Sequence, residues 1–216
     1  MKNYILFDLD GTLTDPMEGI TKSVQYALRS YGIDEPDLWK LTPFIGPPLK
    51  DSFMEYYGFS ESQAAEAIER YREYYAVTGI YENHVFEGIA EMLKELRAAG
   101  KILLVATSKP EVYAKMILEH FGIIRYFDFV GGASFDEVRV RKSDVIAYTL
   151  ESADIRGTEA MVMVGDREHD VWGANENGID CVGVLFGYGS REELEAAGAC
   201  HIVETVEELK EYLLGM

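Results

Sequence analysis

Four acidic residues are spaced so that they could bind one metal ion together. Asp8 and Asp10 stand two residues apart, and Asp166 and Asp170 stand four residues apart. Carboxylates two apart at a strand end can lean the same way, and those four apart share a face if a helix begins there. Because unpaired carboxylates at one site would repel one another, we expect a bound hard cation. Mg²⁺ is favoured, since it takes a few carboxylates and keeps waters for a phosphate.

The elements that would position these acids are alternating strands and helices. Short apolar runs predict buried strands at residues 4–7, 102–106, 127–130, 161–164 and 181–185. Helical patterns lie between them at residues 89–99, 111–121 and 142–152, and the first two are closed by glycine. Unbroken apolar strands that alternate with helices indicate an α/β fold with a Rossmann-like parallel sheet, covered on both faces.

Ligands of an open parallel sheet bind outside the carboxyl ends of its strands. That rule selects the loops 8–12, 107–109 and 166–170, so the four acids should converge on one crevice. Each pair taken alone has a simpler interpretation. The first pair could end a strand and cap a turn, and the second could begin a helix, where acids suit the helix dipole.

Residues 16–83 differ in character from the rest of the chain and predict a helical insert. This stretch is rich in helix formers and tyrosines and poor in β-branched runs. Ser60 to Gln63 is a plausible capping box, and a stripe of apolar residues follows at helical spacing. Such stripes of tyrosine are more often packing surfaces than cofactor sites.

The charge balance excludes several classes of partner. The chain has 216 residues, and its 38 Asp and Glu against 20 Lys and Arg give a formal net charge of −18. Such a molecule repels nucleic acids and anionic membrane surfaces over most approaches. No apolar run approaches the ~18 residues of a membrane span. We therefore expect neither a nucleic-acid nor a membrane partner.

Cysteine and histidine usage points to a reducing compartment and an oxygen-ligated metal. The two cysteines, Cys181 and Cys200, have no CxxC spacing, and the first residues enter a strand pattern without a signal-peptide core. The four histidines show no metal-binding spacing. A cytoplasmic location is the simplest interpretation.

Four motifs, in order along the chain, resemble those of the haloacid dehalogenase superfamily of phosphatases. They are Asp8-Leu9-Asp10-Gly11-Thr12-Leu13-Thr14, Thr107-Ser108-Lys109-Pro110, Lys142, and Gly165-Asp166-Arg167-Glu168-His169-Asp170. The first and fourth are specific when found together, whereas Thr-Ser or a lone lysine is weak. The resemblance covers nearly the whole chain and is strongest to phosphoglycolate phosphatase-type members. It implies a HAD-like α/β core of residues 1–15 and 84–216, with residues 16–83 inserted as a small helical cap domain.

This resemblance also implies a role for each motif residue. Asp8 would be the nucleophile that forms an aspartyl-phosphate, and Asp10 would be general acid and then general base. Mg²⁺ would be held by Asp8, the main-chain carbonyl of Asp10, and Asp166, with Asp170 behind them. The implied substrate-binding residues are Gly11, Thr12, Thr107, Ser108, Lys109 and Lys142. Gly11 would let the backbone approach the substrate closely, and Lys142 would supply a fixed positive charge.

The sequence departs from the family pattern at the third motif. Family members commonly continue the lysine with proline, whereas Lys142 is followed by Ser143-Asp144-Val145. Arg139 and Arg141 are therefore alternatives for the cation, and Lys109 is a further rival.

Other positions separate the activities found within the family. Phosphomutases carry a basic residue in the cap loop and a histidine after the first hinge, but the matching positions here hold Leu49 and Ile20. This disfavours a sugar phosphomutase. Dehalogenases lack the second aspartate of the first motif, so Asp10 points to hydrolysis.

The expected activity is Mg²⁺-dependent hydrolysis of a small phosphorylated metabolite, most like that of phosphoglycolate phosphatase. A 5′-nucleotidase acting on nucleoside monophosphates is the nearest alternative, and a phosphate-binding module would require loss of an essential acid. Residues 14–16 and 80–87 would be the two strands of a hinge, and the proline-stiffened loop 44–50 could dip into the site or simply join two helices. We expect a monomer or a small homo-oligomer.

Overall fold

The computed structural model describes residues 3–135 and 138–216. The chain divides into two compact units, one formed by Met1–Asp15 and Val85–Met216 and the other by Pro16–His84. The sequence analysis placed the second boundary one residue earlier, between residues 83 and 84. Residues 1–2 of the predicted core domain lie outside the described residues.

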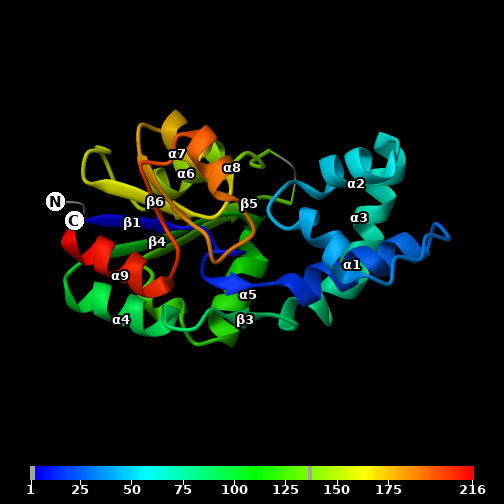
Figure 1. Cartoon of the computed structure of the whole chain (residues 1–216), viewed down its shortest axis with the longest axis horizontal. Coiled ribbons are helices and arrows are strands. Elements are labelled where there is room, and N and C mark those ends of the chain that lie inside the picture. The colour runs from blue at the N-terminus through cyan, green and yellow to red at the C-terminus, as the bar shows by residue number, and fades with distance from the viewer. Residues whose placement is uncertain (1–2, 136–137) are drawn as a thin grey trace. The chain divides into compact units, whose positions relative to one another are not determined.

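A parallel sheet forms the centre of the first unit (Figure 1). Its strands, within the described residues, are β1 (Tyr4–Phe7), β4 (Ile102–Pro110), β5 (Phe129–Ala133), β6 (Met161–Gly165), β7 (Asp180–Val184) and β8 (His201–Val203). Their order is β5-β4-β1-β6-β7-β8, and every pairing is parallel. β1 therefore lies between β4 and β6, where the order of the strands reverses direction. The predicted α/β class with a parallel sheet is confirmed.

Three strands differ from the sequence prediction by more than one residue at an end. β4 was expected to end at residue 106, yet it runs to Pro110 with a register shift between Thr107 and Pro110. β5 was expected at 127–130 and instead includes both glycines that follow, because these residues pair with the end of β4. The edge strand β8 was not predicted, since its three residues are too few to show a period.

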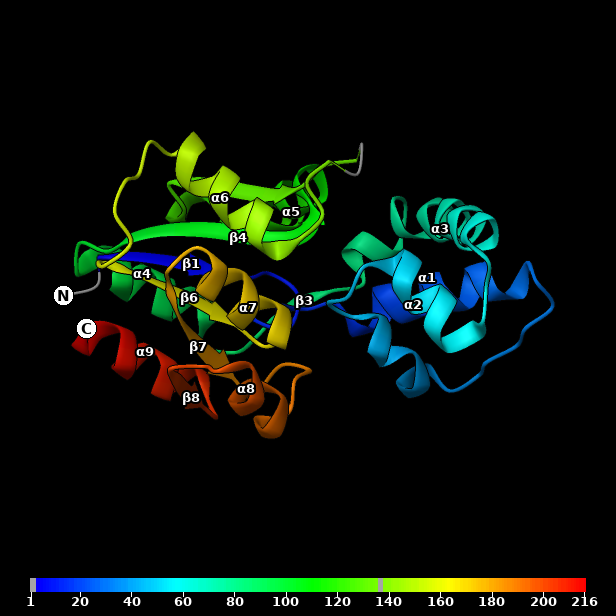
Figure 2. The same ribbon diagram turned by 90° about the horizontal axis from the view of Figure 1, so that it is seen from above.

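Helices cover both faces of this sheet. They are α4 (Ile89–Ala98), α5 (Glu111–His120), α6 (Lys142–Ser152), α7 (Glu168–Glu176), α8 (Arg191–Ala197) and α9 (Val206–Gly215), with a 3₁₀ turn at Ile124–Tyr126. Helices α6, α7 and α8 lie on one face and α4, α5 and α9 on the other (Figures 1 and 2). The core side of α4 shows why such segments are helical, since Ile89, Met92, Leu93 and Leu96 follow the helical period and are all buried.

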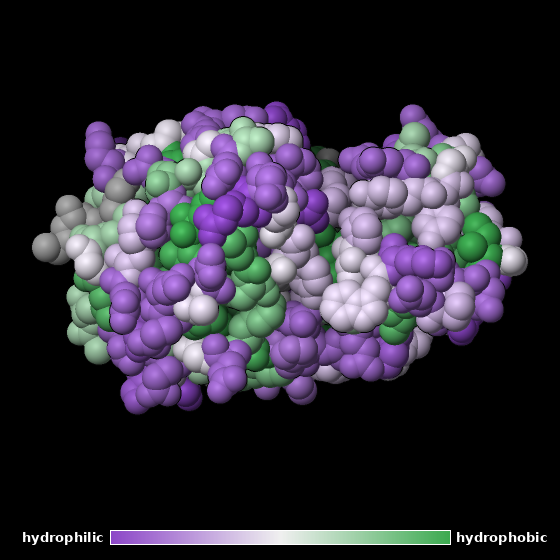
Figure 3. All heavy atoms as spheres, in the orientation of Figure 1, coloured by the Kyte–Doolittle hydropathy of each residue, from purple (hydrophilic) through white to green (hydrophobic). Residues whose placement is uncertain are grey.

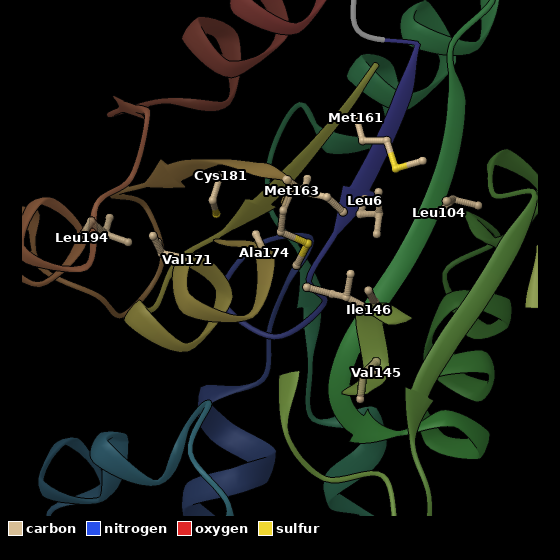
Figure 4. Close-up of a cluster of buried hydrophobic side chains, with 12 residues drawn as sticks. Leu6, Leu104, Val145, Ile146, Met161, Met163, Val171, Ala174, Cys181 and Leu194 are labelled. Atoms are coloured by element: carbon tan, nitrogen blue, oxygen red, sulfur yellow. The ribbon is translucent and has the colours of Figure 1, made fainter. Parts of the chain in front are cut away.

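One hydrophobic cluster fills the space between the sheet and the helices α6, α7 and α8. Leu6, Leu104 and Met163 come from the central strands and meet Ile146 of α6 and Val171 of α7 (Figure 4). All five side chains are fully buried. The cluster lies beneath the carboxyl ends of β1 and β6, so it supports the positions from which the acidic side chains project.

The second unit is helical. It contains α1 (Met17–Arg29), α2 (Leu49–Tyr57) and α3 (Glu61–Tyr75), with 3₁₀ turns at Leu38–Phe44 and Gly79–Tyr81. The predicted capping box is present: the Ser60 hydroxyl accepts from the Gln63 backbone N–H, and the Gln63 side chain accepts from the Ser60 backbone N–H. Ala64, Ala67 and Tyr71 of the predicted stripe are buried, so the stripe is a packing surface.

Two short strands mark the places where the chain passes between the units. β2 (Thr14–Asp15) and β3 (His84–Val85) form a two-stranded sheet. The Phe86 backbone N–H also donates to the Leu13 carbonyl, at 3.2 Å. These strands occupy the segments in which the sequence placed a hinge; hinge motion itself stays a prediction.

Hydrophilic side chains cover much of the face drawn in Figure 3, in keeping with the excess of acidic residues. Within the described parts of the chain, no helix is both long and apolar enough to traverse a lipid bilayer.

Candidate active site

The acidic residues project from neighbouring strand ends of the first unit. Phe7 at the end of β1 is in register with Val105 of β4 and Val164 of β6, so Asp8 and Asp166 follow strands that end side by side. The Asp8 backbone N–H donates to the Val164 carbonyl at 2.9 Å, which extends the pairing by one residue. The rule for parallel sheets therefore selects the correct edge.

Three carboxylates meet at this edge. One oxygen each of Asp8, Asp166 and Asp170 lie within 4.8 Å of one another, and all three side chains are buried. Asp170 reaches the cluster because α7 begins at Glu168, which places Asp170 on the first turn. Asp170 Oδ2 accepts from the Arg167 backbone N–H at 3.1 Å. The resemblance implied that Asp170 stands behind the other ligands; its carboxylate is part of this group of three, and its role toward a metal stays a prediction.

Lys142, the first residue of α6, supplies the positive charge at this cluster. Its ammonium lies 2.7 Å from Asp8 Oδ1 and 2.7 Å from Asp170 Oδ1, and it donates to the Ala106 carbonyl at 3.1 Å. Burial alone would lower the pKa of this ammonium, but the carboxylates of Asp170 and Asp8 raise the pKa above its ordinary value. Lys142 therefore stays charged.

The alternative cations from the sequence analysis are engaged elsewhere. Arg141 forms an ion pair with Glu176 at 2.8 Å on the surface. Arg139 donates to the Gly132 carbonyl at 2.8 Å, and its guanidinium stacks 3.5 Å from the centre of the Tyr148 ring. Neither of these contacts involves the carboxylate cluster.

Asp10 and Lys109 form a second buried pair. Lys109 Nζ lies 2.5 Å from Asp10 Oδ2, and Asp10 Oδ1 has no hydrogen-bond partner among the described residues. Burial raises the pKa of the Asp10 carboxyl, and the nearby Lys109 opposes that shift. A carboxyl with a raised pKa can hold a proton closer to neutral pH, which suits a general acid.

The predicted phosphate-binding hydroxyls lie at the same strand ends. Thr107 is buried on β4, and its hydroxyl accepts from the Lys109 backbone N–H at 3.2 Å. Ser108 next to it is half-buried. Thr12 is buried after β1, and its hydroxyl faces Asp166 Oδ1 at 3.4 Å.

The structure leaves no room for a side chain at Gly11, and the expected close approach of its backbone to a substrate stays a prediction. Its φ is +82°, a region that favours glycine, and a Cβ at this position would lie only 2.2 Å from Asp166 Oδ2. Gly11 therefore lies in close contact with the carboxylate of Asp166.

The electrostatics of the three carboxylates indicate that they fit a cation. Burial raises the pKa of Asp166 well above its ordinary value, and the neighbouring charges of Asp170 and Asp8 raise it further. Burial also raises the pKa of Asp170, with Lys142 opposing the shift. A single lysine does not neutralise three buried acids, and carboxylate oxygens are the donors that Mg²⁺ prefers. The donor set fits Mg²⁺.

Two supports of Asp166 were missed by the sequence reasoning. The backbone N–H of Tyr188 donates to Asp166 Oδ2 at 2.8 Å. Glu193 of α8 accepts from Arg167 Nε at 2.8 Å and from the Glu168 backbone N–H at 2.9 Å, so it holds the loop that carries Asp166. The sequence signal for the first is a tyrosine between two glycines, four residues after the end of β7. Glu193 carries no comparable signal.

Similarity to known proteins covers almost the whole chain. Residues 5–184 match the family described as haloacid dehalogenase-like hydrolase. A Pseudomonas aeruginosa protein named 5′-nucleotidase is 50% identical over 97% of this chain and 94% of its own length. The Mycobacterium tuberculosis tyrosine-protein kinase PtkA is 43% identical over 97% of this chain and 72% of its own length. A Vibrio vulnificus phosphoglycolate phosphatase is 31% identical over 97% and 95%, respectively.

Solved structures agree with these relatives. A protein from Clostridium acetobutylicum, described as a predicted phosphatase, superposes with a TM-score of 0.96 at 50% identity over 100% of both chains. A protein from Clostridium difficile, described as a putative phosphatase, gives a TM-score of 0.88 at 53% identity over 98% of both chains.

Proposed function

The chain belongs to the haloacid dehalogenase-like hydrolase family and is a phosphatase of that family, and from this premise we propose that it hydrolyses small phosphate monoesters through an aspartyl-phosphate on Asp8. The observation that carries the proposal is the buried cluster of Asp8, Asp166 and Asp170 with Lys142 at its side. A carboxylate that attacks a phosphoryl group needs nearby positive charge to offset the repulsion between the two anions. Lys142 supplies one such charge, and a cation held by the three carboxylates would supply the rest.

Asp8, Asp166 and Asp170 are the side chains that would hold Mg²⁺, together with the main-chain carbonyl of Asp10. When bound, this ion supplies positive charge that offsets the negative phosphoryl oxygens. The Lys142 ammonium, 2.7 Å from Asp8 Oδ1, keeps the nucleophile oriented and adds a charge that does not depend on the metal.

Asp10 is the residue that would move the proton. In the first step its carboxyl protonates the leaving oxygen while Asp8 attacks phosphorus, and the P–O bond to the alcohol breaks. In the second step the Asp10 carboxylate takes a proton from water, which attacks phosphorus and releases inorganic phosphate from Asp8. The raised pKa of Asp10 supports the first of these steps.

Nucleoside 5′-monophosphates are the substrates we propose to test first. The relative named 5′-nucleotidase is 50% identical to this chain, whereas relatives named phosphoglycolate phosphatase are 29–31% identical. This reverses the order suggested by the sequence motifs, in which phosphoglycolate came first. Phosphoglycolate therefore becomes the second candidate.

The deciding experiment is a measurement of phosphate release from a panel of esters in the presence of Mg²⁺. The panel contains nucleoside 5′-monophosphates, phosphoglycolate, sugar phosphates and 4-nitrophenyl phosphate, and kcat/KM ranks them. The variant Asp8→Asn should lose turnover completely and remain folded, and Asp144→Asn, on the exposed side of α6, is the matched control. Full activity in Asp8→Asn would remove the proposed nucleophile.

A further inference from the structure

The loop after β7 contacts two distant parts of the chain through a single residue. The Tyr188 backbone N–H donates to Asp166 Oδ2 at 2.8 Å, and the Tyr188 hydroxyl donates to Asp15 Oδ1. The backbone of Tyr188 thus contacts a residue of the proposed metal site, and its side chain contacts β2.

The two glycines beside Tyr188 hold this loop against Asp166. A Cβ on Gly187 would lie 2.6 Å from Asp166 Oδ2, and a Cβ on Gly189 would lie 1.8 Å from the Asp166 carbonyl. Neither position can accept a side chain without a shift of the backbone. The position of Tyr188 is therefore set by the same contacts that set Asp166.

Asp15 is the last residue of the first unit before the chain enters the second at Pro16. It is also the last residue of β2, which pairs with β3 on the returning segment. The hydrogen bond from the Tyr188 hydroxyl is therefore made to the residue directly before the inserted unit. Both Asp15 and Tyr188 are half-buried, where a charge-assisted hydrogen bond is stronger than in full solvent exposure.

We propose that Tyr188 is a positioning residue that fixes the attachment strand β2 to the loop holding Asp166. This inference rests on the proposed phosphatase function and deepens it, because it assigns a residue that connects the insert to the chemistry. The hydroxyl is the part of the side chain that makes this connection, because it donates to Asp15 Oδ1.

The variant Tyr188→Phe removes the hydroxyl and retains the backbone N–H that holds Asp166. With 4-nitrophenyl phosphate and Mg²⁺ we expect kcat/KM to fall about tenfold, roughly the effect of losing one charge-assisted hydrogen bond. We expect kcat and KM to change together, as they do when a hinge is disturbed. The matched control is Tyr126→Phe, whose hydroxyl accepts from Arg125 at 3.2 Å, and it should behave as the wild type.

Two readouts are independent of turnover. Hydrogen exchange of a peptide spanning residues 9–17 should speed up in Tyr188→Phe and not in Tyr126→Phe, because β2 loses its anchor. The affinity for Mg²⁺ alone, measured by isothermal titration calorimetry, should stay within about twofold of the wild type, because the contact between the Tyr188 amide and Asp166 remains. A loss of about tenfold in Mg²⁺ affinity would overturn the proposal, since Tyr188 would then act through Asp166.

A double-mutant cycle with Asp15→Ala separates the proposed bond from other effects of either residue. In the Asp15→Ala background, Tyr188→Phe should change kcat/KM by less than about twofold. If Tyr188→Phe lowers kcat/KM as much in the Asp15→Ala background as in the wild type, the proposal is overturned. It is also overturned if hydrogen exchange of the peptide 9–17 is the same in Tyr188→Phe as in the wild type. If the wild type releases no phosphate from any ester, the proposed function fails, and the exchange experiment still decides the role of Tyr188.

Discussion

Asp166→Asn should stabilise the metal-free protein, although it removes a residue of the proposed metal site. Asp166 is 1% exposed, and the charges of Asp170 and Asp8 add to the effect of burial in raising its pKa. Asparagine keeps an oxygen that can accept from the Tyr188 backbone N–H, so that contact is retained. The variant therefore removes chiefly the repulsion.

The size of this repulsion follows from the geometry. With an effective dielectric constant of about 20, two like charges 4.8 Å apart repel by about 3.5 kcal/mol. Asp166 faces two such carboxylates, and Lys142 offsets about one of them. One uncompensated repulsion remains, so a gain of about 3–4 kcal/mol is expected, which corresponds to about 6–16 °C in Tm for a chain of this length.

The gain should depend on pH. Because the folded-state pKa of Asp166 is raised, the folded protein holds this proton more tightly than the unfolded chain does. The loss of folding stability caused by Asp166 in the wild type is therefore absent below the ordinary aspartate pKa of 3.8. This loss grows as the pH rises toward the folded-state pKa. The advantage of Asp166→Asn should be small near pH 4 and largest at pH 7–8.

Thermal unfolding in EDTA, at several pH values, measures this difference. Excess Mg²⁺ should reverse the order of the two proteins, because binding stabilises the wild type by mass action. Asp144→Asn, with an exposed carboxylate, should show no gain. Destabilisation of Asp166→Asn in EDTA at pH 8, or a gain that does not change with pH, would refute the electrostatic reasoning.

Three further variants test other contacts of the site. Lys142→Met removes the ammonium from the buried acids and should cost about 3–5 kcal/mol in urea unfolding at pH 8 in EDTA, with loss of turnover. Gly11→Ala should weaken Mg²⁺ binding in a calorimetric titration, whereas Gly100→Ala, with a similar φ of +80° and open space around it, should only lose about 1–2 kcal/mol of stability. Lys109→Met removes the charge that lowers the pKa of Asp10, so the alkaline limb of the kcat/KM pH profile, where the general acid loses its proton, should move to higher pH.

Apolar periodicity and the rule for ligand sites in parallel sheets were sufficient to predict the fold class and the edge of the sheet that carries the acids. Asp8 and Asp166 come together because they follow β1 and β6, which are neighbouring parallel strands paired in register. Sequence spacing contains that information once the sheet is assumed to be parallel.

The finer contacts depend on long-range packing that no local pattern encodes. The pairing of Lys142 with both Asp8 and Asp170 depends on where α6 docks, so the sequence left Arg139 and Arg141 as alternatives to Lys142. Strand β4 extends beyond its apolar residues because its polar end also pairs with β5. The role of Tyr188 depends on a loop that closes back on a residue 22 positions earlier.

The acids, the lysines and the loop that braces Asp166 all belong to the unit that contains the sheet, while Pro16–His84 forms one continuous insertion that leaves and returns through paired strands. Recombination at these two points can therefore replace the whole insertion without cutting a strand of the large sheet or displacing a carboxylate. We therefore expect that exchange of Pro16–His84 for another insertion would leave the strand ends that carry Asp8 and Asp166 intact.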